Sequence, residues 1–89
     1  MLKHYNISIF GRVQGVGFRW SALEQAQKLS ITGFIRNEPD GSLYIEVEGE
    51  SDQLVTFIAW CHKGPFWGKV DRVEALEDTL KHFTSFTVK

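Results

Sequence analysis

The chain has 89 residues, of which 43% are hydrophobic and 24% are charged, and its formal net charge is −1. These values are typical of one soluble globular domain, residues 1–89, and they argue against a disordered chain and against the basic surface of a nucleic-acid-binding protein. Cys61 is the only cysteine, which excludes an intrachain disulfide and a Cys-x-x-Cys site, and no apolar stretch approaches the roughly 18 residues of a membrane span.

The first half of the chain predicts a strand, a helix and two further strands. Tyr5–Phe10 alternates as a half-buried strand does, whereas the apolar residues of Arg19–Leu29 recur at the spacing of a helix face. Ile31–Arg36 predicts a second strand, and Glu38-Pro39-Asp40-Gly41 is a strong turn sequence. Ser42–Glu48 alternates cleanly and predicts a third strand with one buried face. Its inward residues are Leu43, Ile45 and Val47, and its outward residues are Tyr44, Glu46 and Glu48.

The second half predicts one helix and two strands. Ser51 is a good N-cap for the helix, and Asp52 would lie near the positive end of the helix dipole. An apolar stripe at helical spacing follows, made of Leu54, Phe57, Ile58 and Cys61. Gly64-Pro65 ends that helix. Lys69–Leu76 and Phe83–Val88 then predict the last two strands.

This order of elements predicts an α+β fold of the ferredoxin-like type, a βαββαβ sandwich with a short extra C-terminal strand. Right-handed crossovers place both helices on one face of a mostly antiparallel sheet. The first and second strands then run parallel, with the third strand between them. Their C-terminal ends lie at the same edge of the sheet, about 10 Å apart. We therefore expect the segments that follow these two strands to face each other.

The loop between the first strand and the first helix reads Gly11-Arg12-Val13-Gln14-Gly15-Val16-Gly17-Phe18-Arg19. Its glycines allow successive N–H groups to point inward, and the helix that follows adds free N–H groups and the positive end of its dipole. Arg19 supplies a planar cation that can bind two oxygens. These features suit a phosphate group. From the residues alone, a plain strand-to-helix turn is an equal alternative, because neither the dinucleotide fingerprint nor a Walker A sequence is complete.

Two stretches resemble the signature of the acylphosphatase family, namely Gly11–Arg19 and Gly33–Gly41, which reads Gly-Phe-Ile-Arg-Asn before an Asp-Gly turn. The resemblance runs from about Tyr5 to the C-terminus. It implies an acylphosphate phosphohydrolase that acts on small acyl phosphates, releases inorganic phosphate and needs neither a metal ion nor a cofactor. It implies catalytic roles for Arg19 and Asn37. It also implies a phosphate-binding loop made of Gln14, Gly15, Val16, Gly17 and Phe18.

The chemistry of an acyl phosphate fits these residue types. Its leaving group is a carboxylate, whose conjugate acid has a pKa of about 4, so the bond breaks without a strong general acid. The remaining tasks are to neutralise the phosphoryl oxygens and to place a water molecule in line with the breaking bond. Arg19 and the loop amides suit the first task. The amide of Asn37 suits the second, because it can accept from water and donate to phosphate.

Other residues receive structural interpretations. The three histidines share no metal-ligand spacing, and we expect all of them on the surface: His4, His62 and His82. Arg12 and Arg36 are interpreted as solvated charges at strand ends, and Cys61 as a small core residue. Ser30 stands where the family usually has a helix-ending glycine, which makes that helix end less favourable. Four aromatic residues either line an acyl-group pocket or pack against the helices or the loop after Gly64, and we favour packing: Trp20, Trp60, Phe66 and Trp67.

Two alternatives to a free-standing hydrolase remain open. Ferredoxin-like folds also host RNA-binding and metal-carrying modules, although neither the aromatic RNP1 pattern nor a Cys-x-x-Cys loop is present. The chain could also resemble the acylphosphatase-like domain of a larger carbamoyl-phosphate-handling maturation enzyme; its starting Met1 and its length favour a separate protein. The N-terminus lacks the apolar region of a signal peptide, so we expect a cytoplasmic monomer without membrane partners.

Overall fold

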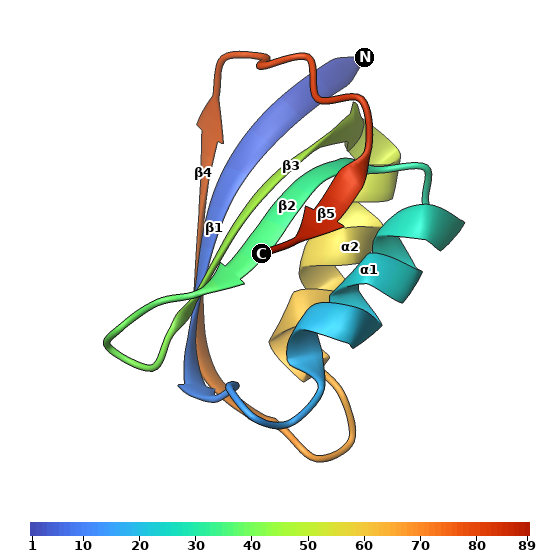
Figure 1. Cartoon of the computed structure of the whole chain (residues 1–89). Coiled ribbons are helices and arrows are strands. Elements are labelled where there is room, and N and C mark those ends of the chain that lie inside the picture. Colours follow the sequence, from blue (N-terminus) through green and yellow to red (C-terminus); the bar gives the residue numbers. More distant parts are fainter.

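The computed structural model describes all residues 1–89, arranged as one sheet with two helices packed on one of its faces (Figure 1). The elements in chain order are β1 (Leu2–Arg12), α1 (Phe18–Lys28), β2 (Thr32–Asn37), β3 (Leu43–Glu50), α2 (Ser51–Lys63), β4 (Lys69–Asp78) and β5 (Phe86–Val88). Neither helix has the length and hydropathy that crossing a lipid bilayer would require.

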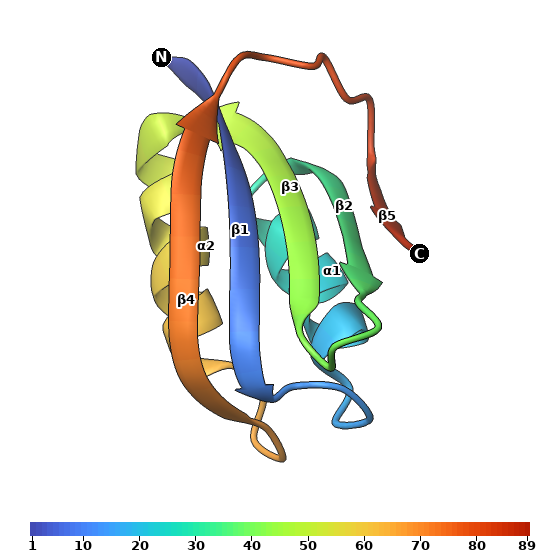
Figure 2. The same ribbon diagram turned by 90° about the vertical axis from the view of Figure 1, so that its left-hand side faces the viewer.

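The strands lie in the order β4-β1-β3-β2-β5 (Figure 2). β3 is antiparallel to both β1 and β2, so β1 and β2 run parallel on either side of it, as predicted. β4 pairs antiparallel with β1, and β5 pairs parallel with β2. The predicted ferredoxin-like arrangement is therefore confirmed. The last strand is shorter than predicted, because residues 83–85 are irregular and only Phe86–Val88 pair with β2.

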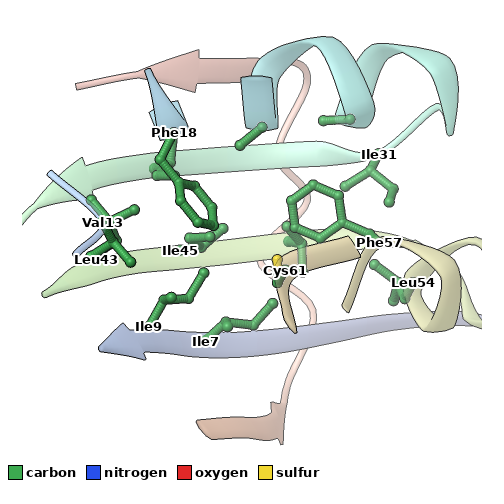
Figure 3. Close-up of a cluster of buried hydrophobic side chains, with 14 residues drawn as sticks. Ile7, Ile9, Val13, Phe18, Ile31, Leu43, Ile45, Leu54, Phe57 and Cys61 are labelled. Carbon is green, nitrogen blue, oxygen red and sulfur yellow. The ribbon is translucent and has the colours of Figure 1, made fainter. Parts of the chain in front are cut away.

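The core lies between the helices and the sheet face that they cover. Fourteen buried residues form one cluster, in which Ile7 and Ile9 of β1 face Phe57 and Cys61 of α2 (Figure 3). The predicted inward residues of β3 all belong to this cluster. Cys61 is fully buried, and its burial raises the pKa of the thiol well above the ordinary value. The alternation of β1 and β3 therefore predicts this face of the sheet correctly.

The opposite face of the sheet is only partly open to solvent. Residues 79–83, the covering segment, follow β4, and in Figure 2 the chain passes the upper end of the sheet here on its way to β5. Glu48 accepts hydrogen bonds from the backbone N–H groups of Lys81 and Phe83, and the Phe83 ring stacks on His4. As a result His4 is completely buried and Glu48 is only 6% exposed. The prediction of a surface His4 is therefore wrong. Glu48 does face outward from the core, as predicted, but the covering segment shields it from solvent.

The start of α2 and the end of α1 can be compared with the predictions made from the sequence. The N-cap of α2 is Glu50 rather than Ser51, and no side chain makes a capping hydrogen bond there. Asp52 does lie in the first turn, as predicted. After α1, Ser30 has a φ of 56°, in the left-handed region where a side chain is unfavourable. The chain thus adopts at Ser30 the backbone that the expected glycine would adopt more easily.

Candidate active site

The C-terminal ends of β1 and β2 point in the same direction, downward in Figure 2. Residues that follow β1 and the last residue of β2 line one pocket. The pocket has a volume of about 90 Å³, and we call it the edge pocket. Its seven lining residues are Val13, Gly15, Gly17, Phe18, Arg19, Trp20 and Asn37. Both predicted catalytic residues line it, together with three of the five predicted loop residues. Segments far apart in the sequence therefore meet here, because β1 and β2 are parallel.

The loop between β1 and α1 offers unused hydrogen-bond donors to the edge pocket. Gly15 and Gly17 have φ values of 74° and 80°, and a Cβ at either position would meet nothing within 4 Å. Glycine is needed there for the left-handed backbone rather than for close packing. The backbone N–H groups of residues 14–17 donate to no oxygen of the protein. Gly17 is also the N-cap of α1, so the unpaired N–H groups of the first helical turn follow directly.

Arg19 lies in the first turn of α1, where no acidic residue balances its charge. The positive end of the helix dipole lies at this same turn, so a bound anion would relieve an unfavourable concentration of positive charge. The Arg19 side chain is half-buried, and its Nη1 donates to the backbone oxygen of Lys89 at 2.7 Å. This bond ties the guanidinium to the end of the chain after β5. The remaining N–H groups of the guanidinium make no hydrogen bond within the protein and are free to bind an oxyanion.

Asn37 is the last residue of β2, where it pairs in register with Leu43. Its side chain is exposed and makes no hydrogen bond within the protein. An amide in that state keeps both its donor and its acceptor groups for a ligand or a water molecule. The strand fixes its backbone while the side chain lines the edge pocket.

Gln14 connects the two segments that carry the candidate residues. Its Nε2 donates to the backbone oxygens of Glu38 at 2.7 Å and Ser42 at 3.0 Å, across the β2–β3 turn. That turn is supported by Asp40, whose pKa is lowered by the hydrogen bond from the Ser42 hydroxyl. The Gln14 side chain therefore holds the turn that follows Asn37 against the loop. The sequence places Gln14 in the loop but does not predict these two hydrogen bonds, because their acceptors are backbone atoms.

The remaining loop residue, Val16, does not line the edge pocket and packs against the core. Arg36 also lies elsewhere, over the ring of Tyr44 and paired with Glu38 on the other face of the sheet. Arg12 is exposed and outside the pocket, as expected for a solvated charge. None of the lining residues is a histidine, cysteine or carboxylate, the usual ligands of a metal ion.

The four aromatic residues take different environments. Trp60 packs against Phe18 and Phe57, as predicted. Phe66 and Trp67 contact each other at the tip of the loop before β4 and are 88% and 75% exposed. Trp20 is 63% exposed at the rim of the edge pocket, so the packing prediction is wrong for this residue. Phe66 and Trp67 pack only on each other, within the loop after Gly64.

The fold is that of an α+β sandwich protein, and the edge pocket brings together free hydrogen-bond donors and one guanidinium, the groups that an oxyanion would require. The family model of the acylphosphatases matches residues 5–88, nearly the whole chain. The chain belongs to the acylphosphatase family. An acylphosphatase of Nocardioides sp. is 39% identical over 89 residues, covering 100% of this chain and 90% of that protein. The crystal structure of acylphosphatase from Bacillus subtilis superposes with a TM-score of 0.95 at 33% identity, covering 100% of this chain and 99% of that one.

A larger protein also contains this fold. The chain superposes on full-length HypF in its phosphate- and nucleotide-bound form with a TM-score of 0.89 and 33% identity. The match covers 100% of this chain but only 12% of HypF. The match to the Nocardioides and Bacillus acylphosphatases instead covers nearly all of both partners. The comparisons therefore favour the acylphosphatases, and they do not favour a non-enzymatic binding module.

Proposed function

We propose that this acylphosphatase hydrolyses small acyl phosphates by direct in-line attack of water on phosphorus, at the edge pocket and without a metal ion. The hydrolase activity follows from membership of the family, whose model covers residues 5–88. The location of the reaction rests on one observation above all. The edge pocket combines the free amide of Asn37 with Arg19 and the unpaired N–H groups of the loop.

The reaction converts an acyl phosphate and water into a carboxylate and inorganic phosphate. The water oxygen forms a bond to phosphorus while the bond from phosphorus to the acyl oxygen breaks. The electron pair of that bond leaves on the carboxylate, and both protons of the water remain on the released phosphate, one on the attacking oxygen and one transferred to another phosphoryl oxygen. A carboxylate is a stable leaving group, so the main barrier lies in bringing water to a dianion and in stabilising the charge on the phosphoryl oxygens.

Arg19 and the loop N–H groups bind the phosphoryl oxygens. Their hydrogen bonds to the phosphoryl oxygens are charge-assisted, and the donors are already positioned by the loop and the helix, so little reorganisation is needed in the transition state. The bond from Arg19 to the Lys89 backbone oxygen keeps the guanidinium in a fixed orientation. Asn37 holds the attacking water through its side-chain oxygen and donates to the phosphoryl group through its nitrogen. Gln14 acts as a positioning residue, because it fixes the turn after Asn37 relative to the loop.

The same chemistry removes the need for a metal ion. A metal ion in phosphoryl transfer neutralises oxygen charge and stabilises the leaving group. Here Arg19 and the N–H groups supply the positive field, and the carboxylate needs no stabilising Lewis acid.

We propose further that the chain works as a single domain of residues 1–89 and as a cytoplasmic monomer that binds no nucleic acid. The near-neutral net charge of −1 supports the last point, because a nucleic-acid-binding surface needs an excess of basic residues.

The proposal is tested by measuring phosphate release from benzoyl phosphate and from acetyl phosphate, with and without a metal chelator. We expect both substrates to be hydrolysed, and we expect the rate for each substrate to be the same with and without chelator. Loss of turnover with chelator, restored by added Mg²⁺ or Zn²⁺, would contradict the metal-free mechanism. Absence of turnover under both conditions would contradict the assignment as an acylphosphate hydrolase.

A further inference from the structure

The edge pocket is too small to enclose an acyl phosphate that carries a large acyl group. Its volume is about 90 Å³, whereas pockets that enclose drug-sized ligands measure about 300–1,000 Å³. If the phosphoryl group and the attacking water occupy the pocket, a large acyl group must extend past its rim. The residues at the rim then decide which acyl groups are bound well.

Among the seven lining residues, only one has an exposed apolar side chain. Val13 and Phe18 are each only 1% exposed, because both belong to the core. Gly15 and Gly17 have no side chain, and the polar groups of Arg19 and Asn37 serve the phosphoryl group and the water. Trp20 remains, with 63% of its surface accessible.

The start of α1 explains how Trp20 comes to the rim. Phe18, the first residue of the helix, is anchored in the core against Trp60 at a ring distance of 5.2 Å. The two residues that follow it on the helix are therefore turned out of the core, and both line the edge pocket. The helix thus presents a guanidinium and a large aromatic ring side by side at the same opening.

We propose that Trp20 is a specificity-determining residue, whose indole packs against the acyl group and makes this chain favour aromatic and extended apolar acyl phosphates over acetyl phosphate. The inference rests on the proposed function, because it takes the phosphoryl group to lie in the edge pocket. An aromatic ring on an indole buries apolar area and adds a stacking contribution, whereas an acetyl group is too small to cover the indole.

Trp67 provides a matched control. It is a second exposed tryptophan, on the loop before β4, and it contacts Phe66 rather than the edge pocket. Substitution of Trp67 removes an exposed indole of the same size without changing the rim of the pocket.

The experiment compares kcat/KM for benzoyl phosphate and for acetyl phosphate in the unmodified protein, Trp20→Ala, Trp20→Phe and Trp67→Ala. The selectivity ratio is kcat/KM for benzoyl phosphate divided by kcat/KM for acetyl phosphate. Comparison of this ratio between a variant and the unmodified protein cancels the different intrinsic reactivity of the two substrates. We expect Trp20→Ala to lower the selectivity ratio about fivefold or more. We expect Trp20→Phe to retain most of the preference and Trp67→Ala to leave the ratio unchanged.

Inhibition by inorganic phosphate separates the acyl contact from phosphate binding. We expect the inhibition constant of Trp20→Ala to stay within about twofold of the unmodified value, because phosphate lacks the acyl group. The inference is overturned if folded Trp20→Ala and Trp20→Phe keep the unmodified ratio, or if Trp67→Ala lowers it equally. If the unmodified protein hydrolyses neither substrate, the proposed function itself fails, which is a different result from an unchanged ratio.

Discussion

The two ends of the sheet use the same polar groups in opposite ways. At the beginning of β1, the Glu48 carboxylate accepts from the backbone N–H groups of Lys81 and Phe83, and it lies 2.7 Å from Nδ1 of His4. At the other end, backbone N–H groups and the guanidinium of Arg19 surround the edge pocket, and no Asp or Glu side chain lines it.

The difference is where the anion comes from. Around Glu48 the chain supplies its own anion, and the result is a closed cluster that holds the covering segment on the sheet. Nε2 of His4 is satisfied as well, since it lies 2.8 Å from Oδ1 of Asn6 and 3.1 Å from a carboxylate oxygen of Glu46. In the edge pocket the anion must come from solution. We therefore expect the first end to contribute to stability, and we propose that the second end contributes to binding and catalysis.

Substitution of Arg19 should cause the largest effect, because it removes the only cation of the open end. We expect Arg19→Ala to lower kcat/KM by about 10³-fold or more and to weaken inhibition by phosphate. Arg19→Lys should restore only part of the activity, since an ammonium group cannot bind two oxygens in one plane. Arg12→Ala is the matched control, because Arg12 is exposed and lies outside the pocket. Equal losses in both variants would mean that only the general positive field matters.

Substitution of Asn37 should separate catalysis from binding at the open end. We expect Asn37→Ala to lower kcat by about 10²-fold, because the attacking water is no longer positioned. The phosphate inhibition constant should change much less, since Arg19 and the loop amides remain. Asn37 is exposed, so the melting temperature should stay near that of the unmodified protein. If the folded Asn37→Ala variant keeps nearly full kcat, Asn37 does not position the water and has only a structural role beside the turn.

Substitution of Glu48 should affect the closed end alone. We expect Glu48→Gln to lower the free energy of unfolding by about 1–3 kcal/mol at neutral pH, because an amide nitrogen cannot accept from the N–H groups it would face. Turnover of benzoyl phosphate by the folded variant should change little. Denaturant unfolding measures the first quantity, and Glu24→Gln on the exposed side of α1 is the control.

The effect of Glu48 should also depend on pH. Burial alone would raise its pKa, but the hydrogen bonds from Lys81, His4 and Phe83 outweigh burial and hold the pKa below the ordinary value of 4.5. A depressed carboxyl pKa stabilises the folded state above the unfolded pKa, and this stability is lost as pH falls. The difference in stability between the unmodified protein and Glu48→Gln should therefore shrink below about pH 4.5. A difference that stays constant down to pH 3 would contradict this account of the cluster.

The sequence predicts the open end better than the closed end, for physical reasons. The strand-helix order puts the ends of β1 and β2 at one edge, so the juxtaposition of the loop with Asn37 follows from topology. Burial of His4 does not follow, because the alternation of β1 assigns it to the outer face and the covering segment has no periodic pattern. The hydrogen bonds from Gln14 to backbone oxygens cannot be predicted for a similar reason, since every residue has a backbone oxygen and the sequence does not show which one is the acceptor.

We propose that the unpaired N–H groups of the loop bind the phosphoryl group. The most direct test is a titration with inorganic phosphate, followed through the ¹H–¹⁵N signals of the backbone amides. Sodium chloride of equal ionic strength is the control. We predict saturable shifts for Gly15, Val16 and Gly17, and unchanged signals for Lys81 and Phe83, which already donate to Glu48. Loop signals that do not move with phosphate, or that move equally with chloride, would contradict the account.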